Sequence, residues 1–471
     1  MLKKILIANR GEIAVRIVRA CAEMGIRSAA IYTEPDRFSL HVKRADEAYN
    51  VGAEPLEGYL NPRKLVALAV ETGCDGLHPG YGFLSENEEL AQICAERGIT
   101  FIGPSAEVIR RMGDKTEARR AMMAAGVPVI PGTQDNLANV EEAVKLATDI
   151  GYPVMLKATS GGGGRGIRRC DDEVDLRRQY DRVVSEASKA FGRADVFMEK
   201  CIVNPKHIES QVLADSQGNV IHLFERDCSI QRRNQKLIEI APSPQLTPEQ
   251  RAYIGELAVR AAEAVGYENA GTVEFLLADN QIYFMEMNTR VQVEHTITEQ
   301  ITGVDIVREQ IRIASGLPLS YRQDDISIRG YALQFRVNAE DPKNDFLPSF
   351  GRISRYYAPG GPGVRTDTAI YTGYTIPPYF DSMCLKLIVW GLTWEETLNR
   401  GARALNDMRL QGVKTTAPYY QQILKHPDFR RAEFNTSFVE SHPELTRYSD
   451  KSRPEDIAMA VAVAIAAHAG L

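Results

Sequence analysis

Residues 286–294 read Glu286-Met287-Asn288-Thr289-Arg290-Val291-Gln292-Val293-Glu294, and every even position in this stretch carries a polar or charged side chain. Successive side chains of an extended chain point to opposite faces, so the five polar groups would line one face of a strand. A solvated strand face alternates in the same way. The upstream segment, residues 271–277, argues against that alternative, because it sets a single glutamate, Glu274, among core-type residues.

These two segments predict an antiparallel hairpin. Positions 274 and 286 lie equally far from Asn280, so a connection of odd length centred on Asn280 places Glu274 opposite Glu286, with Cβ atoms about 5 Å apart. A two-residue turn at 279–280 would break this pairing. Two carboxylates that close repel each other unless a cation lies between them or one of them is protonated.

The polar face predicts two kinds of chemistry. Oxygen ligands from Glu274, Glu286 and Asn288 suit Mg²⁺ or Mn²⁺, the ions that accompany ATP. Further along the same face, Arg290 suits an anion and Glu294 suits a proton acceptor. The pattern therefore predicts an ATP-using enzyme whose metal and anion chemistry is concentrated in this stretch.

The composition is typical of a soluble protein with several domains. At 471 residues the chain exceeds one hydrophobic core, which predicts about two to four domains. The net charge of −6 gives no reason to expect nucleic acid or an anionic membrane as a partner. Seven scattered cysteines without a C-x-x-C pair indicate reduced thiols. The start of the chain lacks a signal-peptide pattern, and the apolar run 457–467 is shorter than the roughly 20 residues that span a bilayer, so we expect a cytoplasmic enzyme.

The order of the expected elements predicts an α/β fold. The expected strands are 4–8, 28–32, 76–78, 154–158 and 196–199, and the expected helices are 12–24, 62–71, 139–149 and 172–190. Alternation of strand and helix near the N-terminus indicates a parallel, doubly wound sheet. The first turn, Asn9-Arg10-Gly11, is not G-x-G-x-x-G, which disfavours a dinucleotide oxidoreductase. After about residue 203, longer alternating strands predict an antiparallel sheet.

A glycine loop follows the expected strand at 154–158. Ser160-Gly161-Gly162-Gly163-Gly164-Arg165-Gly166 lets backbone N–H groups approach phosphate oxygens, and its flexibility suits a lid that opens to admit nucleotide. The alternative is a mobile hairpin tip without a ligand. The loop lacks the G-K-[ST] ending of a Walker loop. Lys157 on the strand and Lys115 upstream are candidate phosphate contacts, and their company favours phosphate binding.

A second charged cluster spans Glu225 to Lys236. It follows an expected strand at 220–224 and mixes acids with bases. Basic runs are usually solvated, but a mixed cluster directly after a strand is typical of an anion-binding loop. We therefore interpret this cluster as a loop that binds an anion.

At these residues the chain closely resembles the biotin carboxylases, members of the ATP-grasp fold family. The resemblance covers about residues 1–440 and is far more specific than any short motif. The motifs that carry it are Ile7-Ala8-Asn9-Arg10-Gly11-Glu12-Ile13-Ala14, His78-Pro79-Gly80-Tyr81-Gly82-Phe83-Leu84-Ser85-Glu86-Asn87, the glycine loop, Glu225 to Lys236, and Glu286 to His295.

The resemblance implies an ATP-grasp fold with an N-terminal Rossmann-like pre-ATP-grasp domain, a mobile lid and a C-terminal antiparallel-sheet domain. The implied division is 1–113 for the N-terminal domain, 114–130 for a connecting helix, 131–202 for the lid, 203–447 for the C-terminal domain and 448–471 for a tail helix. ATP would bind between the lid and the body.

By matching position, the resemblance also implies roles for single residues. ATP contacts would be Lys115, Lys157, Gly163, Gly164, Glu199, Lys200, Ile202, His207, Gln231 and Asn234, with Glu199, Lys200 and Ile202 at the adenine and His207 near the ribose. The metal ligands would be Glu274, Glu286 and Asn288, and bicarbonate would bind Lys236, Arg290, Gln292 and the backbone of Val293. Glu294 would be the general base and Arg336 the biotin-binding residue that stabilises the enolate.

The implied reaction is ATP-dependent carboxylation of biotin through carboxyphosphate, with Mg²⁺ or Mn²⁺ accompanying ATP. One position departs from the family pattern. Asn234 stands where acetyl-CoA carboxylase-type members have His, and an asparagine donates a hydrogen bond but carries no charge.

The chain has no Met-Lys-Met biotin attachment motif and no room for a carboxyltransferase domain. The resemblance therefore implies a homodimeric subunit that acts on biotin held by a separate carrier protein and works with a carboxyltransferase subunit. The segments 201–207 and 229–236 and the Ala-rich end look like the ATP-binding subunit of two-subunit pyruvate carboxylases. The alternatives are a subunit of acetyl-CoA or another acyl-CoA or 2-oxo acid carboxylase, a different ATP-grasp ligase, and a catalytically silent regulatory subunit.

The Ala/Val-rich helix expected at the C-terminal end has two interpretations. It packs on its own body, which is favoured because exposed apolar patches are uncommon, or it docks on the carboxyltransferase subunit. Deletion of residues 453–471 separates the two.

Overall fold

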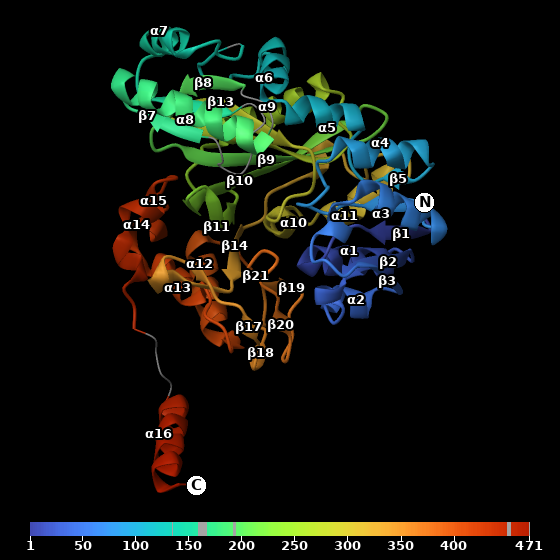
Figure 1. Ribbon diagram of the computed structural model, residues 1–471, viewed down its shortest axis with the longest axis vertical. Coiled ribbons are helices and arrows are strands. Elements are labelled where there is room, and N and C mark those ends of the chain that lie inside the picture. The colour runs from blue at the N-terminus through green and yellow to red at the C-terminus, as the bar shows by residue number, and fades with distance from the viewer. Residues whose placement is uncertain (134, 159–166, 192–194, 450–453, 471) are drawn as a thin grey trace.

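The computed structural model describes residues 1–133, 135–158, 167–191, 195–449 and 454–470 (Figure 1). Gly163 and Gly164, the candidate phosphate contacts of the glycine loop, lie outside the described residues. Three sheets of three or more strands organise the chain, and the division into domains at 113, 130, 202 and 447 stays a prediction.

The N-terminal part is a five-stranded parallel sheet, as predicted. Its order is β3-β2-β1-β4-β5. The strands are β1 (Lys4–Ile7), β2 (Arg27–Thr33), β3 (Glu47–Gly52), β4 (Gly76–His78) and β5 (Thr100–Phe101), and the helices are α1 (Gly11–Glu23), η1 (Glu34–Asp36), α2 (Leu40–Arg44), η2 (Glu57–Leu60), α3 (Pro62–Glu71), α4 (Glu88–Glu96) and α5 (Ala106–Gly113). Ile13 and Ile17 on α1 are buried, which fixes the face that this helix turns to the core.

A small antiparallel sheet forms the lid, at the top of Figure 1. Its order is β7-β6-β8, with α7 and α8 packed on it around their own core. The elements are α6 (Lys115–Ala124), α7 (Val140–Ile150), β6 (Val154–Ala158), β7 (Ile167–Cys170), α8 (Glu173–Phe191) and β8 (Val196–Lys200). Leu156 and Met198 are fully buried between the sheet and its helices, so this segment has a hydrophobic core of its own.

An eight-stranded antiparallel sheet runs through the rest of the chain in the order β13-β12-β9-β10-β11-β14-β21-β19. Its strands are β9 (Lys206–Ala214), β10 (Val220–Arg232), β11 (Gln235–Ala241), β12 (Asn269–Ala278), β13 (Gln281–Asn288), β14 (Tyr331–Asn338), β19 (Val364–Thr368) and β21 (Met383–Gly391). Helices α9 (Pro248–Ala264), α10 (His295–Thr302), α11 (Ile306–Ala314), α12 (Trp394–Asp407) and α13 (Ala417–Lys425) pack against it. The antiparallel sheet predicted after residue 203 is therefore confirmed.

Short elements complete the C-terminal part. They are η3 (Gln323–Asp325), β15 (Glu340–Asp341), η4 (Pro342–Asn344), β16 (Leu347–Pro348), β17 (Gly351–Arg352), β18 (Arg355–Tyr357), β20 (Thr375–Ile376), β22 (Arg409–Gln411), α14 (Pro427–Arg430), α15 (Phe438–Ser441), η5 (Pro443–Thr446) and α16 (Pro454–Ala469).

The hairpin β12–β13 reaches the predicted pairing by a different route. Glu274 does lie opposite Glu286. The connection, however, is a two-residue turn of Asp279 and Asn280, both with left-handed φ (48° and 60°), where an odd-length loop was predicted. A β-bulge at Met285 adds one residue to β13 and shifts the register, which restores the pairing that such a turn would otherwise break.

The predicted single strand face from 286 to 294 is wrong beyond its first half. Strand β13 ends at Asn288, and the residues that follow leave the sheet. Glu294 is the N-cap residue of α10. A helix start within the stretch turns its second half away from period two, although the polar side chains still line one cavity.

The predicted anion-binding loop at 225–236 is also wrong as a loop. Strand β10 continues to Arg232, β11 begins at Gln235, and the two-residue turn between them is Arg233-Asn234, with φ of 50° and 64°. Asparagine adopts the left-handed region more readily than most residues, which gives Asn234 a conformational role in this turn. The charged residues of the cluster therefore project from paired strands.

Helix α16 does not pack on the body, contrary to the favoured interpretation of the C-terminal end. In Figure 1 it stands apart from the remaining elements. Four of its apolar side chains are exposed: Met459 (68%), Val461 (51%), Val463 (63%) and Ile465 (64%). Within the described part of the chain, no helix is both long and apolar enough to cross a membrane.

Four histidines make the fold sensitive to acid. Burial lowers the pKa of His41 and His222 from 6.5 to about 4, and that of His78 and His295 to about 3. Below about pH 6.5 the unfolded chain binds a proton at each position, whereas the folded chain does not until the lower values are reached. Unfolding therefore takes up protons between pH 6.5 and about 4, and in this window these histidines lower the free energy of unfolding as the pH falls.

We expect His222→Gln to make this dependence shallower. The variant removes one of the four protons, which changes the slope by about 1.4 kcal/mol per pH unit. The measurement is denaturant unfolding at several pH values between about 6.5 and 4.5. His468→Gln, on the exposed helix α16, is the control. Equal slopes for His222→Gln and the unchanged protein would contradict the assignment.

Candidate active site

A single large cavity brings the predicted site residues together. It has a volume of about 1050 Å³ and lies between the lid and the eight-stranded sheet. The predicted residues that line it are Lys115, Lys157, Glu199, Lys200, Ile202, His207, Gln231, Asn234, Lys236, Glu274, Glu286, Asn288, Arg290, Gln292, Val293, Glu294 and Arg336. These are all of the predicted site residues that the structure describes.

The floor of the cavity is a row of charged residues across four neighbouring strands. Glu286 on β13 pairs with Glu274 on β12, Glu274 with Glu209 on β9, and Glu209 with Arg226 on β10. Directly opposite residues of an antiparallel sheet share a face with Cβ atoms about 5 Å apart. The sheet therefore holds three carboxylates and a guanidinium side by side, and Glu274, Glu209 and Arg226 are buried.

Glu274 is the most heavily bonded of these carboxylates. Its Oε1 accepts from Asn288 Nδ2 (2.7 Å) and Gln292 Nε2 (2.7 Å), and its Oε2 lies 2.7 Å from His207 Nε2. Burial would raise the pKa of Glu274, but Lys236 and His207 hold it well below its ordinary value. Burial and the charge of Glu274 raise the pKa of the neighbouring Glu286. The two carboxylates thus have opposite shifts, as expected where like charges share a site.

Lys236 on β11 is the shared cation of the site. Its Nζ contacts Glu209 Oε1, Glu294 Oε1 (2.7 Å) and Glu274 Oε1 (3.2 Å). Burial alone would lower the pKa of this ammonium, but the three carboxylates raise it well above its ordinary value. Burial raises the pKa of Glu209 to about 7, with Lys236 opposing that shift. Lys236 therefore stays charged and holds three acids around one point.

Glu294 lies between two cations. It is 2% exposed, with Lys236 on Oε1 and Arg336 Nη2 3.0 Å from Oε2. Burial would raise its pKa, but these cations hold it well below its ordinary value. Arg336 Nε also bonds to Glu239 Oε1, a fully buried carboxylate. Glu294 is therefore ionised and oriented across the neutral pH range.

Arg290 reaches the cavity from the segment after β13. Its Nε lies 3.0 Å from Glu86 Oε2 and its Nη2 donates to Asn288 Oδ1 at 2.7 Å. Burial would lower the pKa of Arg290, but Glu86 raises it. The guanidinium is thereby fixed beside the carboxylate pair, where it can bind an anion.

A buried lysine supports the backbone next to Glu294. Lys386 on β21 is fully buried, and its Nζ donates to the carbonyl oxygen of Val293 (2.9 Å) and pairs with Glu12 Oε1 (3.1 Å). Glu12 also accepts from the hydroxyl of Tyr81. This network ties the Val293–Glu294 backbone to the N-terminal parallel sheet.

On the lid side of the cavity, cations surround one carboxylate. Lys157 on β6 pairs with Glu199 Oε2 and Arg119 lies 3.5 Å from Glu199 Oε1. Burial lowers the pKa of Lys115 at the start of α6, while Glu286 raises it. Lys200 donates to the carbonyl oxygens of Gly151 and Tyr152 (2.8 and 3.0 Å), so its ammonium is bound within the lid.

His207 has a different neighbour from the predicted ribose. Its imidazole contacts Glu274, so it belongs to the carboxylate cluster of the sheet floor. Ile202, Gln231 and Asn234 line the cavity as predicted, and their ligands stay predictions.

Several residues that shape the site were missed by the sequence analysis. They are Glu86, Arg119, Glu209, Glu239 and Lys386. Glu209 had a signal of the same kind as the opening stretch, because His207, Glu209 and Gln211 alternate with apolar residues along β9. The others are brought in from distant elements and had no local signal.

The donor set fits a divalent metal. Glu274 and Glu286 face each other across two strands with oppositely shifted pKa values, and the side-chain oxygen of Asn288 lies beside them. Carboxylate and amide oxygens are the ligands that Mg²⁺ and Mn²⁺ prefer. The geometry therefore supports the predicted metal ligands, and Lys115 and Lys157 on the opposite wall suit phosphate groups.

Three family models match the chain. Residues 1–109 match "Biotin carboxylase, N-terminal domain", residues 114–322 match "Carbamoyl-phosphate synthase L chain, ATP binding domain", and residues 334–441 match "Biotin carboxylase C-terminal domain". Together they span both sheets and the lid.

Individual relatives are similar over nearly the whole chain. The 2-oxoglutarate carboxylase small subunit of Hydrogenobacter thermophilus is 55% identical over 100% of both chains. The matching pyruvate carboxylase subunit of Methanothermobacter thermautotrophicus is 52% identical over 94% of this chain and 90% of its own. A crystal structure of the H. thermophilus biotin carboxylase domain dimer, in complex with MgADP, ADP and bicarbonate, has a TM-score of 0.93 and 56% identity, covering 96% of this chain and 100% of that one.

Proposed function

The chain belongs to the biotin carboxylase family, and from that premise we propose that it uses ATP and bicarbonate to carboxylate biotin held on a separate polypeptide. The predicted resemblance and the predicted ATP-grasp fold are confirmed. The chain is accordingly a biotin carboxylase subunit of a multi-subunit carboxylase. The roles of single residues below are part of the proposal.

The observation that carries the proposal is the arrangement of Lys236 among Glu209, Glu274 and Glu294 on one wall of the cavity, opposite the lid lysines. An ammonium shared by three acids binds an anion when one acid is neutralised or engaged elsewhere. A metal at Glu274 and Glu286 would do this. ATP would span the cavity from Glu199, Lys200 and Ile202 to the metal, with Lys115 and Lys157 on its phosphates.

Bicarbonate would lie between the cations that face Glu294. Lys236 and Arg290 would bind its oxygens, and Gln292 and the backbone N–H of Val293 would orient it. Glu294 would take its proton, and the oxygen so freed would attack the γ-phosphorus of ATP, breaking the bond to ADP and forming carboxyphosphate. A divalent metal, when bound, neutralises charge on the phosphates.

Arg336 would act in the second half of the reaction. Carboxyphosphate breaks into CO₂ and phosphate, the phosphate takes the N1′ proton of biotin, and N1′ forms the bond to CO₂. The guanidinium of Arg336, already fixed by Glu239 and Glu294, would stabilise the enolate oxygen that develops on biotin. A closed lid would exclude water, which hydrolyses carboxyphosphate.

One assay tests the proposal. ATP hydrolysis is measured without additions, with bicarbonate, and with bicarbonate plus free biotin. We expect turnover that requires bicarbonate and rises with biotin. ATP cleavage indifferent to bicarbonate would indicate another ATP-grasp ligase, and no cleavage under any condition would indicate a regulatory subunit.

Lys386 is proposed as a positioning residue for bicarbonate. Lys386→Met removes the donor to the Val293 carbonyl, so we expect the KM for bicarbonate to rise about tenfold, or about 1.4 kcal/mol, while the KM for ATP stays unchanged. Because this variant leaves Glu12 without its cation, Glu12→Gln combined with Lys386→Met is measured beside it. Equal changes in both KM values would indicate a merely structural role.

The final acceptor and the partners are proposed from the relatives. One relative is named for pyruvate and the other for 2-oxoglutarate, which supports a 2-oxo acid acceptor, with pyruvate as our first choice. A biotin carboxyl carrier protein and a carboxyltransferase subunit would be the partners. The dimeric crystal structure of the relative supports a homodimer, and seven free cysteines support a reducing compartment such as the cytoplasm.

Helix α16 is proposed to dock on the carboxyltransferase subunit. Its apolar side chains are exposed, and the aligned H. thermophilus protein extends over the same length of chain. We expect deletion of residues 453–471 to leave the melting temperature and the carboxylation of free biotin unchanged and to abolish co-elution with the carboxyltransferase subunit. Docking would be contradicted by a lower melting temperature or by co-elution as before.

A further inference from the structure

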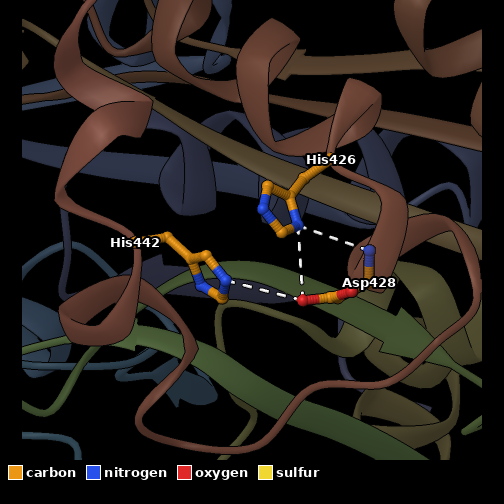
Figure 2. Close-up of side chains that lie close together, drawn as sticks. All are labelled: His426, Asp428 and His442. Atoms are coloured by element: carbon orange, nitrogen blue, oxygen red, sulfur yellow. Dashed lines mark hydrogen bonds and ion pairs between the residues drawn. The ribbon is translucent and has the colours of Figure 1, made fainter.

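A cluster of two histidines and an aspartate lies outside the residues that line the large cavity. His426 is the N-cap residue of α14, Asp428 belongs to α14, and His442 follows the end of α15 (Figure 2). The three side chains are partly buried, between 18% and 35% exposed. Figure 2 shows both rings turned toward the same carboxylate oxygen of Asp428.

The distances in this cluster are too long for hydrogen bonds between side chains. His442 Nε2 lies 3.5 Å from Asp428 Oδ2, and His426 Nδ1 lies 3.9 Å from the same atom. Hydrogen bonds of this type have lengths of about 2.7–3.2 Å. The other oxygen of Asp428, Oδ1, is bound by Arg431 Nη2, so Oδ2 is the one that faces the two rings.

The local hydrogen bonds fix which ring nitrogens carry protons. His442 Nδ1 is 2.7 Å from the carbonyl oxygen of Phe438, which only accepts, so Nδ1 donates and Nε2 is left with a lone pair in the neutral ring. His426 Nδ1 accepts from the backbone N–H of Asp428 at 3.3 Å and is therefore also unprotonated. Two nitrogen lone pairs and a carboxylate oxygen thus converge with no donor among them.

We propose that His426, Asp428 and His442 bind a divalent transition-metal ion, of which Zn²⁺ is the type. Zinc bonds to imidazole and carboxylate of about 2.0–2.2 Å in a tetrahedral arrangement separate the ligand atoms by about 3.3–3.5 Å. The observed 3.5 and 3.9 Å need only a small closure. The fourth position would be taken by water or by Glu444, whose Oε1 lies 3.8 Å from His426 Nε2.

The surroundings have the features of a built metal site. Metal-binding histidines commonly donate their other ring nitrogen to a backbone carbonyl, which is what His442 does through Phe438. Both rings pack on the buried Phe438, at centroid distances of 5.4 Å for His426 and 4.6 Å for His442, which limits their rotation. Imidazole ligands favour Zn²⁺ and its neighbours over Mg²⁺.

The ion would hold together a segment that supports the approach to the lid. Between α14 and α15, Thr436 N donates to the carbonyl oxygen of Pro205 (2.9 Å) and Ser437 Oγ donates to Asn204 Oδ1 (2.6 Å). Residues 201–205 connect the lid strand β8 to β9 of the large sheet. A metal that joins α14 to the end of α15 would stabilise this connection, and its role would be structural.

The test is zinc binding to the full-length chain without a histidine tag. Metal-free protein is titrated with Zn²⁺ in excess Mg²⁺, so that the carboxylates of the large cavity are occupied. The visible absorption of bound Co²⁺ reports nitrogen ligation. The variants are His442→Ala and Asp428→Asn, with His468→Ala on the exposed helix α16 as the matched histidine control.

We expect about one equivalent of bound Zn²⁺, a zinc-dependent rise in melting temperature, and loss of both in His442→Ala and Asp428→Asn but not in His468→Ala. The affinity should fall by at least the roughly 10- to 100-fold that loss of an outer-shell partner costs. Melting temperatures without metal show whether each variant is folded. Failure of the unchanged protein to bind Zn²⁺, or equal binding by the unchanged protein and a folded His442→Ala, would overturn the proposal. Neither outcome bears on bicarbonate-dependent ATP cleavage.

Discussion

Replacement of Glu294 by Gln is expected to abolish bicarbonate-dependent ATP cleavage while nucleotide binding is kept. The amide fits the same space between Lys236 and Arg336 but does not accept the proton of bicarbonate. A positioned general base contributes about 10²- to 10⁴-fold, so turnover should fall by that order. The pKa of Glu294 lies well below its ordinary value because both cations face it. Bicarbonate that draws Lys236 away would raise that pKa and make Glu294 a stronger base.

The measurement is steady-state ATP cleavage with bicarbonate, beside equilibrium binding of a non-hydrolysable ATP analogue. Glu71→Gln, which removes a charge from the exposed end of α3, is the control and should behave as the unchanged protein. Retained turnover in Glu294→Gln would sink the assignment of the base. Loss of analogue binding would mean that the variant disturbs the nucleotide site as well.

Replacement of Arg336 by Ala is expected to damage the carboxylation of biotin more than ATP cleavage without biotin. Removal of one preorganised donor to a developing oxyanion costs about 10²- to 10³-fold in turnover. ATP cleavage should fall less, because Arg336 touches that step only through its contact with Glu294.

A second variant keeps the Arg336 test interpretable. The alanine leaves the buried Glu239 without its cation, so Arg336→Ala is combined with Glu239→Gln to avoid an unpaired charge. Arg336→Lys keeps the charge but loses the planar pair of donors. Equal losses in the two assays, for the single and the double variant, would count against the enolate role.

The sequence predicted the carboxylate pair from local information alone. Period-two alternation and the spacing of Glu274 and Glu286 about Asn280 were sufficient, because a hairpin is a local structure. The turn length was wrong, since a bulge is not visible in a polar–apolar pattern. The end of β13 at Asn288 was missed for a related reason. Helix α10 begins at Glu294 in a polar stretch that period two describes equally well.

Residues outside the hairpin depended on the family resemblance or were missed. Lys236 and Arg336 come from β11 and β14, and no spacing in the sequence places them beside Glu294. Glu239 and Lys386 each look like an isolated charge within an apolar strand, and their partners lie far away in the chain. Long-range pairing decides such contacts, so local periodicity cannot supply them.

The bulge at Met285 determines how this gene can tolerate insertions and deletions. Ile282 and Phe284 turn to the apolar core, and Met285 is the extra residue that lets Glu286 turn to the cavity instead. Loss of codon 285 would remove the bulge and still leave Glu274 opposite Glu286. Gain of one codon that lengthened the regular strand would place Glu286 opposite Thr272, separating the carboxylates by two strand positions, or about 7 Å. Among descendants of this sequence, a one-residue deletion here is compatible with the metal pair, and a one-residue insertion is not.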